Sequence, residues 1–227
     1  MFSGIVIPEN QKFTIVREDQ NYDEGEPFYY EDSNLESPYR VIVFTTARNL
    51  ALMEKHNNWY GDGTFNVAPK LMTQLYTIQK IIRQKCLPMV NAMVNLPNKK
   101  YLTYLTLFQL IHKNISNYPK SISLDFEKAV FKAVTEVFPS IMIHGCFFHL
   151  SQNFLKHVKK YDCLTIYYSC EIFRQTFNLC QALAFLPPED VIEGFEIVKN
   201  KAPNSFKKVL TYIERTYVGK YKENKKK

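Results

Sequence analysis

The pattern of hydrophobic and polar positions predicts an ordered body that begins near the segment YRVIVFTT. The next segment, ARNLALMEKHN, has helical spacing at Leu50, Leu52 and Met53. Three short apolar or aromatic runs follow, WYGDGTFNV, LYTIQKII and LPMVNAMV, and the polar segments APKLMTQ and RQKC separate them. Runs of this length with polar breaks are typical of strands, so the pattern predicts a three-strand meander.

Helical and strand patterns alternate beyond the meander. YLTYLTLFQLIHKNI predicts a helix, KSISLD a short strand, FEKAVFKAVTEVF an amphipathic helix and SIMIHGCF another strand. The helical spacing places these side chains on the inward faces: Leu102, Leu105, Phe108 and Ile111 or His112 in the first helix, and Phe126, Val130, Val134 and Val137 in the second. From about residue 57 to residue 160 the predicted order is three strands, helix, strand, helix, strand, helix. Three later segments, EIFRQTFNLCQALAFLP, PEDVIEGFEIVKNKA and NSFKKVLTYIERTY, are helical in pattern.

Composition sets the size of the body and its surroundings. With 227 residues and 46% hydrophobic side chains, the chain can bury a substantial core as one large domain or one and a half. It has no run of about 18 apolar residues that could span a bilayer, and its first residues lack the pattern of a secretory signal, so we expect no membrane partner and an intracellular protein. Five irregularly spaced cysteines predict reduced thiols rather than disulfides.

Charge divides the chain further. Residues 1–40 carry three Lys or Arg and nine Asp or Glu, whereas residues 41–219 have a net charge of +9 and the lysine-rich residues 220–227 carry +4. A basic body fits a polyanionic ligand such as nucleic acid, and the alternative is a surface whose charge only maintains solubility. We therefore expect a loosely ordered acidic leader (1–40), a core (41–160), a helical extension (161–219) and a basic tail (220–227).

The predicted order of elements is that of an α/β ribonuclease-H-like fold, a mixed sheet with flanking helices, to which an all-helical C-terminal extension is added. In that fold, metal-binding carboxylates lie on the first and fourth strands. Asp62 lies in the first predicted strand here, and Asp125 ends the fourth. Cleavage of a phosphodiester by paired metal ions requires carboxylates that converge in this way. The alternatives are that Asp62, between two glycines, serves a β-turn and that Asp125 is a helix N-cap. For Glu127, a favourable position near a helix N-terminus is a sufficient explanation.

Several segments taken together resemble the Mutator-like element (MULE) transposases, particularly animal proteins in which this domain is often fused to FLYWCH zinc fingers. The similarity covers residues 41–219 and rests on these segments: WYGDGTFNVAP, QLYTIQ, LPMVNAMVNLPNK, SISLDFEKAVFKAVTEVFP, IHGCFFHLSQNF and ALAFLPPEDVIEGFE. Asp62 and Asp125 match the first two acids of the family's DDE triad. The resemblance implies DNA transposition, a Mg²⁺ or Mn²⁺ cofactor, a DNA partner and a nuclear location, and it leaves self-association as a homo-oligomer open.

The chain departs from the family pattern in two places. The family's third acid, a glutamate in a context like Asn-Asn-x-x-Glu, has no match here, and no Cys/His-spaced finger precedes residue 41. The formal substitutes lie in amphipathic helical patterns and are more simply explained as solvated residues: Glu171, Glu189, Glu193, Glu196 and Glu214. We therefore expect an incomplete, catalytically impaired transposase fragment. The alternative is a domesticated, non-catalytic module that binds DNA or protein.

Cys146 and His149 form a Cys-x-x-His pair after the last predicted strand. A zinc site needs two further ligands, usually a second close pair, and Cys163 and Cys170 are too far apart in sequence to provide one. The MULE family carries a Cys-x-x-His element at this point, which implies a role in orienting DNA or a contact with Asp125. A buried thiol and a hydrogen-bonded histidine are the alternative.

Two groups of lysines are candidates for contact with DNA. The first group, Lys99 and Lys100, follows LPN, and the second follows SQNF: Lys156, Lys159 and Lys160. Recognition of phosphate requires only positive charge on an accessible face. Each group alone is more often part of an ordinary solvated surface, so the lysines are candidates as a set.

Overall fold

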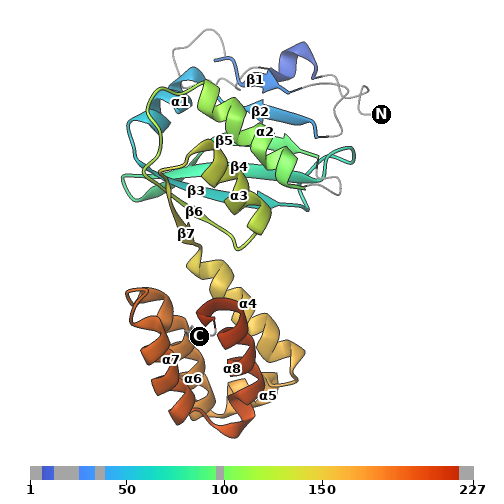
Figure 1. Ribbon diagram of the computed structural model, residues 1–227. Coiled ribbons are helices and arrows are strands. Elements are labelled where there is room, and N and C mark those ends of the chain that lie inside the picture. Colours follow the sequence, from blue (N-terminus) through green and yellow to red (C-terminus); the bar gives the residue numbers. More distant parts are fainter. Residues whose placement is uncertain (1–6, 13–25, 34–38, 96–99, 220–227) are drawn as a thin grey trace, which may run out of the picture. The chain divides into compact units, whose positions relative to one another are not determined.

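The computed structural model describes residues 7–12, 26–33, 39–95 and 100–219 (Figure 1). Its internal contacts divide the chain into two compact units, Met1–Gly145 and Cys146–Lys227. Over the described ranges, the helices are all too short or too polar to cross a membrane.

The first unit is built on a mixed seven-stranded sheet with the order β1-β2-β5-β4-β3-β6-β7. Neighbouring strands are antiparallel from β1 through β3, whereas β3, β6 and β7 are parallel to one another. The strands are β1 (Tyr29–Asp32), β2 (Val41–Phe44), β3 (Asn58–Thr64), β4 (Gln74–Ile82), β5 (Lys85–Val94), β6 (Ser121–Leu124) and β7 (Met142–Gly145). The predicted meander is confirmed as β3, β4 and β5.

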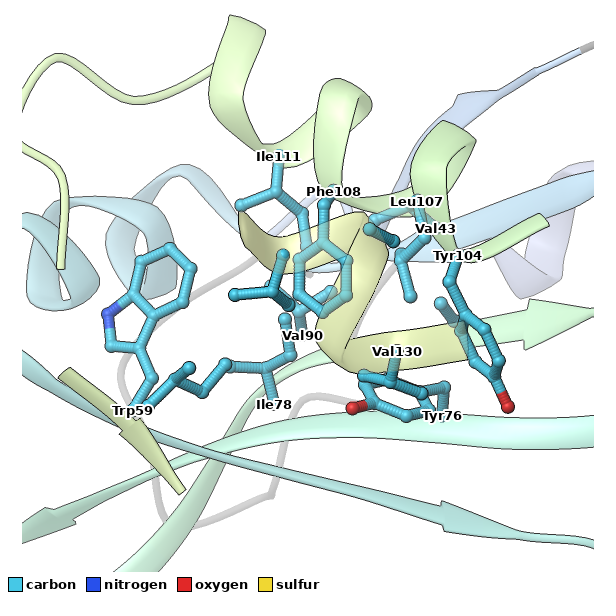
Figure 2. Packing of buried hydrophobic residues seen from close by; sticks show 14 of the residues in the cluster. Val43, Trp59, Tyr76, Ile78, Val90, Tyr104, Leu107, Phe108, Ile111 and Val130 are labelled. Atoms are coloured by element: carbon cyan, nitrogen blue, oxygen red, sulfur yellow. The ribbon is translucent and has the colours of Figure 1, made fainter. Parts of the chain in front are cut away.

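Three helices complete this unit, α1 (Ala47–Glu54), α2 (Lys100–Lys113) and α3 (Lys128–Val137). The strand and helix order that the pattern predicted from residue 57 onward is therefore confirmed. Figure 1 shows α2 and α3 together over one face of the sheet. Alternate residues of the central strands point toward these helices, so that Trp59, Ile78 and Val90 are almost fully buried (Figure 2). This alternation follows from the two-residue period of a strand.

The predicted inward face of α2 is confirmed at Phe108 and Ile111 but not at the two leucines. Tyr104, Leu107, Phe108 and Ile111 are buried, with the spacing i, i+3, i+4, i+7 of one helical face, whereas Leu102 and Leu105 are only half-buried. The prediction chose leucines over Tyr104, although a tyrosine can be buried when its hydroxyl finds a polar partner.

The predicted face of α3 is confirmed only in part. Val130 and Val134 are buried and Val137 is half-buried, but Phe126 precedes the helix, which begins at Lys128, and its side chain is 37% exposed. Helical periodicity does not apply to a residue that lies outside the helix.

Part of the expected N-terminal leader belongs to the sheet. Tyr29–Asp32 form the edge strand β1, and the Asp32 carboxylate pairs with the buried Arg40 guanidinium at 2.6 Å. Glu31 also pairs with Lys113 of α2 at 2.9 Å. Residues 1–6, 13–25 and 34–38 of the expected leader lie outside the described residues, as does the expected basic tail 220–227.

The described part of the second unit consists of helices and their connections. They are α4 (Phe147–Lys160), α5 (Leu164–Ser169), α6 (Glu171–Ala182), α7 (Val191–Lys201) and α8 (Lys207–Ile213), with a π-helical turn at Glu214–Val218. Their core is rich in phenylalanine: Phe154, Phe173, Phe177, Phe195 and Phe206. The three late segments with helical pattern are thus confirmed as helices. The sequence analysis placed residues 147–160 at the end of the core, whereas in the structure α4 packs with α5, α6 and α8.

Candidate metal-binding site

Asp62 and Asp125 lie at the same level of two neighbouring parallel strands. The register of β3 and β6 pairs Asn58 with Ser121 and Tyr60 with Ser123. The same offset, continued by two residues, aligns Asp62 with Asp125, which directly follows β6. Both carboxylate residues are half-buried. The fold therefore brings together two acids that are far apart in sequence.

The local environments of the two acids rule out the simpler explanation for Asp62 and modify that for Asp125. Asp62 lies inside β3, paired with Thr77 of β4, so it does not form a β-turn. The N-cap of α3 is Glu127, which makes no side-chain capping bond, and the Asp125 Oδ1 atom accepts the Glu127 N–H at 3.4 Å. Asp125 thus supports the turn that leads into α3 and is not its N-cap residue.

The glycines on either side of Asp62 provide space for side chains of β4. A Cβ atom on Gly61 would lie 2.6 Å from the Tyr76 Oη atom, and one on Gly63 would lie 1.9 Å from the Gln74 Nε2 atom. Both distances are below van der Waals contact, so neither position can carry a side chain without movement of its neighbour. Glycine within a strand often marks such a close approach. The Gly-Asp-Gly sequence therefore lets polar side chains pack directly behind the Asp62 backbone.

A buried polar group lies behind the two acids, on the helix-covered face of the sheet. The Tyr104 hydroxyl is 3.0 Å from both Gln74 Oε1 and Glu127 Oε2. A phenol has one proton, so Tyr104 donates to one of these acceptors at a time. The neighbouring Tyr76 ring packs edge-on against Tyr104 at 5.5 Å between centroids (Figure 2). The Tyr76 side chain is 3% exposed, and among the residues that the structure describes its hydroxyl has no hydrogen-bond partner.

Burial and the nearby carboxylates raise the pKa values of both tyrosines. Burial, followed by the charges of Asp125, Tyr104, Asp62 and Glu127, raises the pKa of Tyr76 well above its usual 10. Burial and then the Glu127 carboxylate also raise the pKa of Tyr104. Both phenols are therefore neutral at physiological pH, and all three carboxylates act electrostatically on the Tyr76 hydroxyl.

The sequence analysis missed Gln74, Tyr76 and Tyr104 and gave Glu127 no role beyond the helix dipole. One signal was present, because Gln74 and Tyr76 alternate with half-buried residues along β4 and so face the core. A polar residue at an inward strand position requires a polar partner.

The acids present fit a magnesium ion better than zinc. Magnesium is held by one or two protein carboxylates and keeps several water ligands, so Asp62 and Asp125 supply a suitable donor set. Within residues 7–12, 26–33, 39–95 and 100–219, no cluster of three or more His, Cys, Asp or Glu side chains has a geometry that could hold a metal. A zinc site built on Cys146 and His149 has no support among these residues, because structural zinc needs four ligands.

Cys146 and His149 open helix α4 in the second unit. Cys146 is the N-cap residue but makes no side-chain capping bond, and its thiol is free and half-buried. His149 is half-buried in the first turn. Their role in orienting DNA stays a prediction.

The lysines of α4 are accessible. Lys156, Lys159 and Lys160 are exposed, whereas Phe154 and Val158 of the same helix face the core. Lys100 is the first residue of α2, and Lys99 lies outside the described residues. The α4 lysines thus form one solvent-facing basic surface.

The helical glutamates of the second unit have other interactions. Lys199 Nζ contacts Glu196 at 3.0 Å and Glu214 at 3.2 Å, and Glu171 accepts a bond from Gln175 at 3.0 Å. Glu189 and Glu193 are exposed. These contacts agree with the interpretation of the glutamates as surface residues.

No curated protein matches the chain. The family model described as the MULE transposase domain matches residues 58–153. The matched segment begins at the first residue of β3, includes Asp62, Asp125, Cys146 and His149, and ends within α4. This match supports assignment of the α/β segment from β3 to α4 to the MULE transposase family.

Proposed function

We propose that this chain is a transposase-derived domain of ribonuclease-H-like fold that binds DNA and holds Mg²⁺ or Mn²⁺ through Asp62 and Asp125. The observation that carries the proposal is the alignment of these acids on the parallel strands β3 and β6, inside the segment that matches the MULE transposase domain. The strand order β5-β4-β3-β6-β7, with two antiparallel pairs followed by two parallel pairs, supports the fold assignment.

Different structural elements hold the two aspartates in place. Asp62 is held by β3, which is hydrogen-bonded to strands on both sides, and Asp125 is held by the turn between β6 and α3. A bound divalent ion at such a site stabilises negative charge on phosphate oxygens and lowers the pKa of bound water. The rigid strands keep the carboxylates converged, which reduces the cost of ordering the ligands when an ion binds.

The DNA contact is assigned to the basic surface of the protein. Residues 41–219 carry +9, and Lys156, Lys159 and Lys160 project from one side of α4. Phosphate contacts of this kind give affinity without sequence preference. A nuclear location follows from this function.

A second candidate function is DNA binding without catalysis. In the described residues, no third acid joins Asp62 and Asp125 in a metal-holding cluster, and Glu196 and Glu214 are paired with Lys199. Loss of a single electrostatic contact in a preorganised site typically reduces the rate by about 10²- to 10³-fold. A domain with two acids would therefore bind DNA and metal while cutting DNA poorly.

Calorimetric titration of the whole chain with Mn²⁺ tests the proposed site. We expect binding by the parent protein and at least about tenfold weaker binding by Asp62→Asn and by Asp125→Asn, because each substitution removes an anionic ligand. Asp162→Asn is the matched control: it makes the same charge change at an exposed residue with φ of 57°, a conformation that asparagine also tolerates. If both site variants bind Mn²⁺ as the control does, the assignment of the site is wrong.

A further inference from the structure

A series of contacts on the helix-covered face of the sheet links the two candidate metal ligands. It begins at Asp125, whose carboxylate accepts the Glu127 N–H at 3.4 Å. The Glu127 carboxylate contacts the Tyr104 hydroxyl at 3.0 Å, and that hydroxyl contacts Gln74 Oε1 at 3.0 Å. The other end of the Gln74 amide lies against Gly63, the residue after Asp62, where a Cβ atom would be only 1.9 Å away.

We propose that Tyr104 is a positioning residue that fixes the relative placement of Asp62 and Asp125. This inference rests on the proposed metal site and goes beyond it, because Tyr104 belongs to α2 and lies on the helix-covered face of the sheet. Its hydroxyl joins the Glu127 carboxylate, at the start of α3, to the Gln74 amide of β4, which lies against Gly63 of β3. This link adds to the direct pairing of β3 with β6 and to the packing of Leu124 beside Gly61.

Burial makes this series of side-chain contacts rigid. Tyr104 is 0% exposed and Gln74 is 2% exposed, so neither polar group can exchange its partner for bulk water. Hydrogen bonds in such surroundings are stronger than in water, and a missing partner is correspondingly costly. The preceding residue, Thr103, also anchors α2 through a bond from its hydroxyl to the Asn95 carbonyl at 2.8 Å. The position of Tyr104 is therefore determined by both packing and hydrogen bonding.

The distribution of charge gives a second reason for a hydrogen-bond donor, the Tyr104 hydroxyl, beside Glu127. Residues 41–145 contain twelve Lys or Arg and only five Asp or Glu, and three of those acids gather here: Asp62, Asp125 and Glu127. Like charges repel, and the neutral Tyr104 phenol adds a hydrogen-bond donor beside the Glu127 carboxylate without adding charge. Glu127 is committed to Tyr104 in this way, and the three acids do not form a metal-holding cluster in the described residues. We therefore assign Glu127 to support of Asp125 rather than to metal coordination.

The test measures Mn²⁺ affinity by calorimetry in the whole chain. Tyr104→Phe keeps the ring and removes the hydroxyl. We expect its Mn²⁺ affinity to fall by about 10- to 100-fold, the usual effect of losing a partner that orients a metal ligand. Tyr76→Phe is the matched control, because it removes a buried hydroxyl from the adjacent ring that has no hydrogen-bond partner. Its affinity should stay within about threefold of the parent, as expected for a hydroxyl outside this series of contacts.

Two further variants separate positioning from other roles. Ile111→Val removes one methylene from the buried face of α2 and reports what a general loosening of the helix does to Mn²⁺ affinity. Glu127→Gln keeps an oxygen that can accept the Tyr104 hydroxyl, so its loss of affinity should be smaller than that of Asp62→Asn if Glu127 only positions Asp125.

The outcomes are distinct. Binding by Tyr104→Phe that equals the parent, while Asp62→Asn loses binding, would overturn the positioning role and leave the proposed metal site intact. An equal loss in Ile111→Val would also overturn the positioning role. A loss in Glu127→Gln as large as that in Asp62→Asn would make Glu127 a ligand and contradict the inference. A parent protein that binds no Mn²⁺ would refute the metal site and the positioning role together.

Discussion

The Tyr76 hydroxyl occupies the space that a side chain on Gly61 would need. A Cβ atom at Gly61 would lie 2.6 Å from Tyr76 Oη and 2.8 Å from Leu124 Cδ2. Gly61 precedes Asp62 on β3, and Leu124 precedes Asp125 on β6. The residues directly before the two acids are therefore packed against each other and against a buried tyrosine, on the helix-covered face of the sheet (Figure 2).

This packing predicts the effect of Gly61→Ala. The new methyl group must displace the Tyr76 and Leu124 side chains, and overpacking of this kind typically destabilises a protein by about 1–3 kcal/mol. In the Tyr76→Phe background, the closest clashing atom is absent, whereas the Leu124 contact at 2.8 Å and the ring-carbon contact at 3.3 Å remain. The cost of Gly61→Ala should therefore be smaller there. Urea denaturation of the four proteins in this double-mutant cycle measures the difference, and an equal cost in both backgrounds would contradict the packing described here.

The two buried tyrosines should respond in opposite ways to loss of the hydroxyl. Tyr76→Phe removes a buried donor that has no partner, so we expect unchanged or increased stability, by up to about 1 kcal/mol. Tyr104→Phe leaves Gln74 and Glu127 without their shared donor and should cost about 1–3 kcal/mol. Thermal or urea unfolding of both variants provides the measurement. Destabilisation by Tyr76→Phe equal to that by Tyr104→Phe would show that the Tyr76 hydroxyl has a partner after all.

Local pattern was sufficient to predict the elements that carry the site. The polar breaks at APKLMTQ and RQKC separate runs that become β3, β4 and β5, because a strand with one buried face has a two-residue period that survives in the sequence. Asp62 and Asp125 could be paired in advance because the predicted order implied that their strands are neighbours. Register then aligned them without any further information from side chains.

The supporting network could not be predicted in the same way. Gln74, Tyr104 and Glu127 meet from β4, α2 and the start of α3, and only the packed structure brings these elements together. The inward face of α2 was misassigned for a related reason. Tyr104 is buried because polar partners from other elements receive its hydroxyl, and sequence periodicity contains no information about those partners.

Lys80 gives a pH-dependent prediction. Its side chain is 1% exposed, and its ammonium group donates to the Met53 carbonyl at 3.1 Å and to the His56 carbonyl. Burial lowers the pKa of Lys80 to about 8. The charged form is therefore disfavoured in the folded state, and this penalty is fully present below pH 8. It is relieved as the pH rises from about 8 toward the unfolded pKa near 10.5, and only above that pH is Lys80 neutral in both states.

The comparison with Lys80→Met isolates this effect. Between pH 7 and pH 9 the parent should gain about 1 kcal/mol of unfolding free energy relative to Lys80→Met, which has no titrating group at this position. Urea denaturation of both proteins at the two pH values measures the difference. A parent protein whose stability relative to the variant falls over this range would show that Lys80 is stabilised in its charged form.

The last prediction concerns the basic surface of α4. The parent protein should bind duplex DNA with little sequence preference and with an affinity that falls steeply as salt rises, because contacts with phosphate release counterions. Each phosphate contact contributes about 0.9 to the slope of log affinity against log salt. Replacement of all three exposed lysines by glutamine should therefore weaken binding at low salt and reduce that slope by about 2 to 3. The substitutions are Lys156→Gln, Lys159→Gln and Lys160→Gln.

A second triple variant keeps the change in net charge the same and moves it to other exposed lysines of this unit. Its substitutions are Lys201→Gln, Lys207→Gln and Lys208→Gln. If DNA contacts the α4 surface, gel shifts over a salt series should show a smaller loss of affinity and slope for this control than for the α4 variant. Equal losses would mean that DNA responds only to the total charge of the protein. An accessible basic surface binds phosphate with little further requirement. If the parent does not bind DNA even at low salt, DNA binding does not account for the net positive charge, and a protein partner is favoured.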